Sequence, residues 1–322
     1  MSPEASLALQ DHLAEFFLLQ TGQKLGEEGS AFEIDDGGPA PLVRIVLGFP
    51  AARSGVEIVA SVEEHCANLE LAEAAPQFEV VSEISTHSVQ TGLKPLEGIS
   101  NIIAVASGKG GVGKSTVAVN FALALVQEGA RVGVLDADIY GPSAPRLFGL
   151  TDVPGLQKTD AGVQPVMAHG VKIVSMGFVV KPGAAVVWRG PMVQGAIRQF
   201  LADTDWGQPD VLILDMPPGT GDAQLAIAQD IPVDGAVIVS TPQDLALDDA
   251  RKAMNLFDQT HVPILGMVEN MSVFICPHCG EGSHIFGHGG VKAESEALGV
   301  DYLGDIPLHP DLRTRSDAGE PM

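Results

Sequence analysis

The spacing of apolar and polar positions divides the chain near residue 98. Beyond that point, short apolar runs of strand length alternate with segments of helical periodicity, such as Ser115–Glu128, which Gly129 ends. The runs predicted as strands are Asn101–Ala106, Val132–Leu135, Val171–Val174, Val211–Leu214, Gly235–Val239 and Ile264–Val268. Strands that alternate with helices predict an α/β domain over residues 98–322, with a doubly wound and mostly parallel sheet.

Residues 1–97 have an acidic, less regular pattern that predicts a small α+β domain. Helical patterns cover Leu7–Leu19 and the region near Val56–Leu71, and the predicted strands are Leu42–Leu47 and Phe78–Ile84. The segment Gly22–Pro41 is rich in Gly, Asp and Glu and has no predicted element, and Ser85–Gly98 is the predicted linker.

Composition and charge narrow the possible functions. The 322 residues include 41 acidic and 18 basic side chains, and the net charge of −23 argues against nucleic acid or an anionic membrane as a partner. No apolar run has the length of a membrane span, and the start of the chain lacks the pattern of a signal peptide. Three cysteines imply no disulfide framework, so the expected compartment is the cytoplasm, where thiols stay reduced and can bind metal.

A glycine-rich loop follows the first strand of the α/β domain. The segment Gly108–Ser115 fits the Walker A pattern, with a predicted strand before it and a predicted helix after it. The glycines let backbone N–H groups point at phosphate oxygens, Lys114 neutralises the β- and γ-phosphates, and the Ser115 hydroxyl is placed to bind Mg²⁺. The candidate ATP-binding residues here are Gly108, Lys109, Gly110, Gly111, Val112, Gly113, Lys114, Ser115 and Thr116.

Lys109 is a residue that the ordinary Walker A pattern does not specify. A lysine at the start of the loop cannot easily reach its own γ-phosphate, but it can reach the nucleotide of a facing subunit, as an arginine finger does. The segment Lys109–Ser115 resembles the deviant Walker A sequence of the MinD/ParA/nitrogenase-iron-protein superfamily. That resemblance implies a homodimer that sandwiches two ATP molecules.

Three acidic residues follow predicted strands, at the edge where ligands bind in a doubly wound sheet. Asp136 and Asp138 follow Val132–Leu135, and two carboxylates there can order the waters of Mg²⁺ and the attacking water. By its match to the superfamily, Asp138 is expected to position the attacking water, with Asp136 nearer the metal. Asp215 follows Val211–Leu214 and is the expected Walker B acid, which holds Mg²⁺ through water.

Two further residues, Gly219 and Asn270, complete the predicted nucleotide site. Gly219 is expected to give its N–H to the γ-phosphate and so to sense hydrolysis, and Asp222 to cap the next helix. Asn270 follows the strand Ile264–Val268 and offers both a donor and an acceptor to the edge of adenine, as the corresponding position does in the superfamily. An Asx-turn is the competing interpretation of Asn270.

The sequence Cys276-Pro-His-Cys279 has the spacing of a metal knuckle. A thioredoxin-like redox pair needs an amphipathic helix after the first cysteine, which the following residues do not form. A zinc ion within one chain would use Cys276, Cys279, His284 and His288. A [4Fe–4S] cluster needs four thiolates, which two copies of the pair supply at a twofold axis. Cys66 lies in a helical pattern and is expected to be a core or surface thiol.

With these motifs in place, residues 99–322 resemble the Mrp/ApbC group of iron–sulfur carrier ATPases. The resemblance implies that the chain assembles a cluster, in contact with a scaffold or donor, and passes it to apo-proteins, with slow ATP hydrolysis. Its motifs, in order, are Ser107–Thr116, Leu135–Ser143, Trp188–Met192, Asp215–Asp222, Val268–Met271, Cys276–Cys279 and Gly304–Leu308.

Residues 1–97 resemble the small N-terminal domain often fused to these carriers. That domain usually has a cysteine after its second strand, whereas Gly48–Gly55 contains none. We therefore expect this part of the chain to dock partners rather than to bind a cluster.

Two other ATPase classes share the expected fold. A positioning ATPase like MinD or ParA, with the cysteine pair in a structural zinc site, needs a membrane-binding helix or a basic DNA surface. The segment Asp311–Met322 is too short and polar for the first, and the acidic charge opposes the second. An electron donor like nitrogenase iron protein usually spaces its cluster ligands far apart, whereas Cys276 and Cys279 are adjacent.

Overall fold

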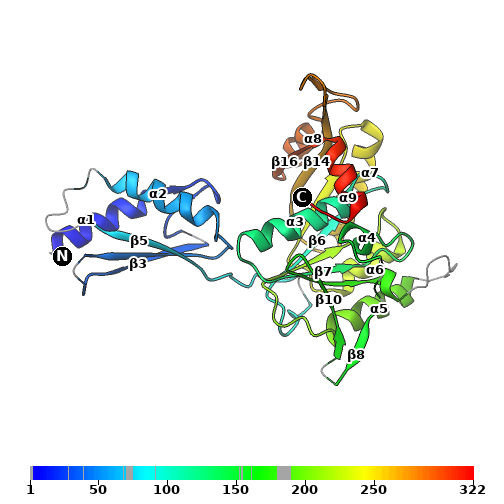
Figure 1. Cartoon of the computed structure of the whole chain (residues 1–322), viewed down its shortest axis with the longest axis horizontal. Coiled ribbons are helices and arrows are strands. Elements are labelled where there is room, and N and C mark those ends of the chain that lie inside the picture. The colour runs from blue at the N-terminus through cyan, green and yellow to red at the C-terminus, as the bar shows by residue number, and fades with distance from the viewer. Residues whose placement is uncertain are drawn as a thin grey trace. The chain divides into compact units, whose positions relative to one another are not determined.

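The structure is a computed structural model, and its described residues form two compact units (Figure 1). One unit lies within residues 1–86 and 127–130, and the other within residues 87–126 and 131–322. The described residues are 3–27, 29–38, 40–67, 69, 75–90, 92–151, 153, 155–160, 162–179 and 190–322. Within them, no helix is long and apolar enough to cross a membrane. The domain boundary at residue 97 stays a prediction.

The smaller unit packs two helices with a three-stranded sheet of order β3-β4-β5. The pair β3–β4 is antiparallel and the pair β4–β5 is parallel. Buried side chains such as Leu13, Ile45 and Val62 form its core. Its elements are α1 (Pro3–Ala14), β1 (Phe17–Leu18), β2 (Gln23–Lys24), β3 (Ser30–Asp35), β4 (Leu42–Leu47), α2 (Ser54–Cys66) and β5 (Gln77–Ser82).

Two predictions for this unit were wrong. The first helix ends at Ala14, and Phe17–Leu18 is a short strand instead of the last turn of a helix over Leu7–Leu19. The segment Gly22–Pro41 contains the strand β3, whose residues alternate between more and less exposed positions. Composition hid this strand, because acidic residues occupy its solvent-facing positions.

The larger unit is built on a nine-stranded sheet in which every pairing among the central strands is parallel. The strand order is β10-β11-β7-β12-β6-β13-β14-β15; β16 also pairs with β14 in parallel, and β10 and β15 are antiparallel. These strands are β6 (Ile102–Ala106), β7 (Val132–Asp136), β10 (Val166–Ala168), β11 (Val171–Ser175), β12 (Val211–Asp215), β13 (Gly235–Ser240), β14 (Ile264–Ile275), β15 (Gly282–Ser283) and β16 (Tyr302–Leu308). The predicted doubly wound, mostly parallel sheet is confirmed.

Helices connect these strands and cover the sheet. They are α3 (Lys114–Gln127), α4 (Ala144–Leu147), α5 (Gly190–Asp203), α6 (Asp222–Asp230), α7 (Asp244–Gln259), α8 (Gly290–Leu298) and α9 (Pro310–Ala318). A 3₁₀ turn, η1 (Met176–Phe178), follows β11, and β8 (Gln157–Thr159) pairs with β9 (Gly162–Gln164). The sequence motif Trp188–Met192 lies partly outside the described residues, which resume at 190.

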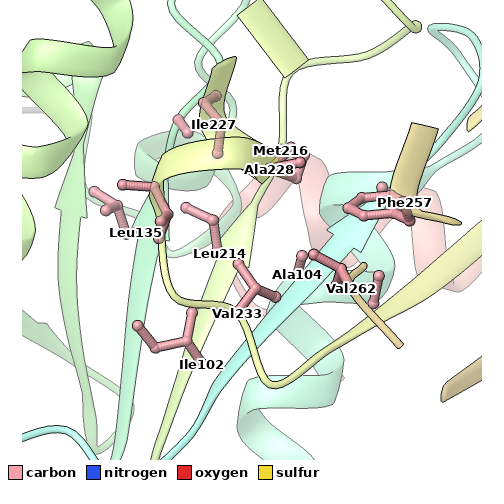
Figure 2. Packing of buried hydrophobic residues seen from close by; sticks show 14 of the residues in the cluster. Ile102, Ala104, Leu135, Leu214, Met216, Ile227, Ala228, Val233, Phe257 and Val262 are labelled. Carbon is pink, nitrogen blue, oxygen red and sulfur yellow. The ribbon is translucent and has the colours of Figure 1, made fainter. Parts of the chain in front are cut away.

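The core of the larger unit consists of aliphatic side chains from adjacent strands and from the helices above them. In Figure 2, Ala104, Leu135 and Leu214 from three neighbouring strands belong to one cluster with Ile227 and Ala228 of α6. Strands β7, β12 and β13 are buried along their whole length, as expected for a parallel sheet covered on both faces.

The strand order places the candidate chemistry on one edge of the sheet. The chain runs from β6 outward to β7 and β11, returns to β12 between β7 and β6, and then continues outward through β13 and β14. Ligands of such sheets bind beyond the carboxyl ends of the strands, where the order reverses. The segment Ser85–Gly98, predicted as a linker, is partly anchored to the larger unit at the opposite edge of the sheet. There, buried Gln90 hydrogen-bonds to the backbone of Ala228, Ile231 and Val233, at the end of α6 and just before β13.

Candidate functional site

The glycines of the phosphate loop are required by close contacts and by backbone conformation. A Cβ on Gly108 would lie 2.0 Å from the carbonyl oxygen of Asp249 in α7. A Cβ on Gly113 would lie 2.1 Å from Nδ2 of Asn270, and Gly113 also has a φ of +85°. Only glycine meets both demands, so the loop packs directly against α7 and the middle of β14.

Lys114, the first residue of α3, is almost completely buried and pairs with Asp215 at the end of β12. Its Nζ donates to Oδ1 of Asp215 and, at 3.0 Å, to the Ser115 hydroxyl. Burial raises the pKa of Asp215, and the charge of Lys114 opposes that shift. Among the described residues, the buried Oδ2 of Asp215 accepts no hydrogen bond. This unpaired oxygen and the Ser115 hydroxyl fit the oxygen ligands that Mg²⁺ prefers.

Asp136 lies at the end of β7 and is fully buried. Its Oδ1 accepts from the N–H of Asp138, and its Oδ2 accepts from the N–H groups of Ser143 and Ala144 and from the Ser175 hydroxyl. Burial, together with the charge of Asp215, raises the pKa of Asp136 to about 7. Because protein donors bind both oxygens, Asp136 shapes the loop that carries Asp138. Asp136 is also paired in register with Asp215, and its predicted place near the metal stays a prediction.

Asp138 and the loop after β12 line one cavity of about 570 Å³. Oδ1 of Asp138 accepts from the N–H groups of Tyr140 and Gly141, each at 3.1 Å. These two hydrogen bonds fix the position of the carboxylate. Pro217, Pro218 and Gln224 lie across the same cavity. The two acidic segments predicted from the sequence therefore face one another, although their roles toward a nucleotide stay predictions.

One expectation for the loop after β12 stays a prediction and another was wrong. The N–H of Gly219 donates to the carbonyl of Ser107 at 3.0 Å, and its expected hydrogen bond to the γ-phosphate stays a prediction. The left-handed conformation of Gly219, with a φ of +97°, gives the amide this direction. Asp222 does not cap α6, because the N-cap is Gly221 and Asp222 is the first helical residue, without a capping hydrogen bond.

Lys109 is half-buried and lies near α7. The hydrogen bond from Lys252, and the charges of Lys252 and Lys109, hold the pKa of the Asp249 carboxyl below its ordinary value. In a single chain, Lys109 is therefore close to an acid of α7, and its predicted reach toward a facing nucleotide stays a prediction.

Asn270 contacts the phosphate loop itself. Its Nδ2 donates to the carbonyl of Val112 at 2.7 Å, and the residue is nearly buried. It also lines a largely apolar cavity of about 870 Å³, together with Thr116, Pro307 and His309. Its Oδ1 and its second amide hydrogen are the groups left for a base, so contact with adenine stays a prediction.

The cysteine pair directly follows β14, which is seven residues longer than its predicted run. The turn between β14 and β15 is closed by hydrogen bonds from Cys276 N–H to the Glu281 carbonyl and from Gly280 N–H to the Cys276 carbonyl. Hydrogen bonds from the N–H of His278 and from Cys279 lower the pKa of the Cys276 thiol. Because metals bind the thiolate, this geometry favours Cys276 as a ligand. Cys279 is exposed.

The histidines of the zinc alternative lie in a different arrangement from the one expected. His284 donates through Nδ1 to the Ser272 carbonyl at 3.2 Å, and its ring lies 4.2 Å from that of His288. Over the described part of the chain, no three His, Cys, Asp or Glu side chains gather as a metal site. The alternative of a four-ligand zinc site within one chain stays a prediction. Cys66 is a buried core thiol of the smaller unit, as expected.

Comparison with known proteins agrees with this geometry. A family model described as ParA: NUBPL iron-transfer P-loop NTPase matches residues 98–322, well over half of the chain. The chain belongs to this family. The resemblance to iron–sulfur carrier ATPases is thereby confirmed, and the loop at Gly108–Ser115 is the phosphate loop of a P-loop NTPase.

Several relatives and a solved structure extend the family match. An iron–sulfur cluster carrier protein of Pseudomonas fragi is 49% identical over 249 residues, which cover 77% of this chain and 87% of the relative. The iron–sulfur cluster transfer protein NUBPL of Mus musculus is 50% identical over 251 residues, 76% of this chain and 78% of the relative. A nucleotide-binding protein of Archaeoglobus fulgidus in complex with ADP has a TM-score of 0.63 and 42% identity, covering 70% of this chain and 88% of that one.

The sequence analysis did not identify two buried polar residues, Glu269 and Ser175, whose hydrogen bonds hold the segments around the site. Glu269 is fully buried, and its carboxylate accepts from the N–H groups of Gly289 and Val291 at the start of α8. Ser175 donates to Asp136 from the end of β11. A polar residue at the end of an apolar strand run was the available signal for both.

Proposed function

We propose that this chain is an ATP-dependent carrier of iron–sulfur clusters. It would hold a [4Fe–4S] cluster between two copies of the chain and pass it to apo-proteins, with slow ATP hydrolysis. The observation that carries the proposal is the Cys276–Cys279 turn, with Cys276 half-buried and Cys279 exposed, which directly follows the strand that also contacts the phosphate loop. The names of the relatives, an iron–sulfur cluster carrier protein and an iron–sulfur cluster transfer protein, support the same cargo.

The proposed binding of ATP follows from the buried ion pair between Lys114 and Asp215. ATP would draw Lys114 from Asp215 toward the β- and γ-phosphates, which leaves Asp215 and Ser115 to hold Mg²⁺. Bound Mg²⁺ would neutralise charge that develops on the phosphates. Asp138 would orient the attacking water from the 570 Å³ cavity, and Lys109 would reach the phosphates of a facing copy.

The base would occupy the apolar cavity of about 870 Å³ beside Thr116. Asn270 can accept a hydrogen bond from the adenine amino group through Oδ1, because its Nδ2 already donates to Val112. Guanine would place a carbonyl oxygen against the same Oδ1, so the proposal includes a preference for ATP over GTP.

The proposed binding of an iron–sulfur cluster depends on the number of thiolates available. One chain supplies two adjacent cysteines, and a [4Fe–4S] cluster takes four, so a cluster at this turn requires two copies. The lowered pKa of Cys276 suits it to ligand exchange at the surface, where an apo-protein can offer its own thiols.

Purification and reconstitution without oxygen test the proposal. We expect a brown dimer with about four iron and four sulfide per two chains, measured by absorbance, iron and sulfide analysis and light scattering. Incubation with an apo-protein that needs a [4Fe–4S] cluster should restore activity to that protein. A colourless monomer with one tightly bound zinc ion would refute the carrier function.

A further inference from the structure

Strand β14 connects the two parts of the proposed site within one element (Figure 1). Near its middle, Asn270 holds the Val112 carbonyl of the phosphate loop, and its last residue, Ile275, directly precedes Cys276. The five residue-to-residue steps from Met271 to Cys276 span about 16 Å when the chain is extended.

The backbone of β14 is irregular just where it meets the phosphate loop. Met271 has a φ of +58°, in the left-handed region that a side chain of this kind rarely adopts. The register between β14 and β16 shifts between Asn270 and Phe274. A strained backbone conformation of this kind persists only where the surrounding structure stabilises it, and it is common at functional sites.

The left-handed residue changes the direction of the side chains. In a regular strand, consecutive side chains point to opposite faces of the sheet. Here both Nδ2 of Asn270 and Cε of Met271 lie near the place that a Cβ of Gly113 would occupy, at 2.1 and 3.9 Å. Gly113 immediately precedes Lys114, so both side chains adjoin the residue that directs the phosphate-binding lysine.

Glu269 and Ser272, which flank Asn270 and Met271, hydrogen-bond to the segment that follows the cysteine turn. Glu269 accepts from the N–H groups of Gly289 and Val291, at 3.1 and 2.9 Å. The Ser272 carbonyl accepts from His284 at 3.2 Å. Of four consecutive residues of β14, the inner two, Asn270 and Met271, therefore lie against the phosphate loop. The outer two, Glu269 and Ser272, hold the two ends of the segment His284–Gly289.

We propose that Met271 is a positioning residue that links the nucleotide state of the phosphate loop to the conformation of the Cys276–Cys279 turn. Movement of Gly113 when phosphates bind displaces Met271, and the pairing of β14 with β15 transmits this displacement to Cys276. The inference rests on the ATP-binding part of the proposed function and not on the cluster, so it can be tested on cluster-free protein.

Thiol alkylation measures this link directly. The full chain, free of metal, is treated with iodoacetamide with and without Mg²⁺ and a non-hydrolysable ATP analogue, and mass spectrometry follows Cys276 and Cys279 separately. We expect the analogue to change the alkylation rate of at least one of them by about fivefold or more, the lower end of coupling between sites. Cys66, buried in the smaller unit, is the internal reference. Light scattering selects a concentration at which every sample has the same oligomeric state.

The decisive variant is Met271→Gly. Glycine adopts a positive φ without strain, so the backbone is kept and the contact with the loop is lost. The nucleotide effect on alkylation should fall below about twofold, while ATP affinity stays within about threefold of the unmodified protein. The control is Met167→Gly, which removes an exposed methionine of β10 at the other edge of the sheet and should leave the effect intact.

Each result decides the matter. The link would be overturned if the analogue did not change the alkylation rate of either cysteine in the unmodified protein. It would also be overturned if the analogue changed that rate equally in the Met271→Gly protein. A protein that shows the link but takes up no cluster would refute the carrier function alone, and a cluster carrier without the link would refute the inference alone.

Discussion

At the scale of single residues, the two lysines of the phosphate loop have different proposed roles toward ATP. Lys114 is buried beside Asp215, and Lys109 is half-buried near Asp249. The first would meet the phosphates of its own chain, and the second those of a facing chain. Substitution of each should therefore affect a different step.

Lys114→Ala is expected to abolish measurable ATP binding, because it removes charge neutralisation at the phosphates and leaves Asp215 buried without its partner. Lys109→Ala should bind ATP but no longer hydrolyse it. Binding is measured by calorimetry and hydrolysis by phosphate release, both on the same preparations. Hydrolysis at the normal rate by the Lys109→Ala protein would mean that no lysine acts across the dimer.

The base contact is the second prediction at this scale. Asn270→Ala should weaken ATP binding by about 1–3 kcal/mol, because buried groups of the base lose a partner and the Val112 carbonyl loses its donor. The comparison with GTP separates these causes, because only the base contact discriminates between nucleotides. Equal affinity of the unmodified protein for ATP and GTP would remove Asn270 from the base site.

At the scale of elements, the contact between the phosphate loop and α7 limits what the loop tolerates. Gly108→Ala would place a Cβ 2.0 Å from the Asp249 carbonyl, so α7 or the loop must move, at a cost of about 1–3 kcal/mol in unfolding free energy. Gly110→Ala is the control, because its Cβ would meet only Pro218, at 3.9 Å. Urea unfolding without nucleotide should show a loss for the first variant and little change for the second.

The starts of β7 and β12 are tied by Arg131 and Asp210, which exchange backbone and side-chain hydrogen bonds. Partial burial acts to raise the pKa of Asp210, but hydrogen bonds from Arg131 and its charge outweigh burial and lower it. A lowered pKa in the folded state gives stability that is present above pH 3.8, the ordinary value, and is lost as the pH falls through the folded value.

Asp210→Asn should therefore reduce the free energy of unfolding at pH 7 by about 0.5–1 kcal/mol, a modest figure because Arg131 is largely exposed. The difference between the two proteins should shrink as the pH is lowered below 4. Urea titrations at several pH values measure it. A difference that is independent of pH would assign the effect to lost hydrogen bonds and not to charge.

The elements also show what the sequence could predict. Apolar runs located β6, β7, β11, β12 and β13 to within one residue at each end, because strands buried on both faces leave an unbroken apolar signal. β3 was missed because only one of its faces is apolar, and β14 was cut short because polar residues from Glu269 onward interrupt it. Motifs located Lys114, Asp215 and the cysteines, but not the direction of the Gly219 amide, which depends on a left-handed backbone.

At the scale of the whole molecule, the central question is how many chains complete the metal site. Cys276 is half-buried and Cys279 is exposed, and the tilted rings of His284 and His288 lie 4.2 Å from one another. If a second copy supplies the missing ligands, the histidines are dispensable for metal binding. If one chain closes the site alone, they are indispensable.

Changing His284 and His288 together to Ala separates these cases. We expect this variant, reconstituted without oxygen, to remain a brown dimer with one cluster per two chains, because the four cysteines alone supply the ligands. Cys276→Ala and Cys279→Ala should both lose the cluster and serve as the positive controls for loss, although they do not discriminate between the models. A double-histidine variant that loses metal while the unmodified chain binds one zinc per monomer would show that the site closes within one chain. The dimer would then need no shared cluster, and the cysteine turn would be structural.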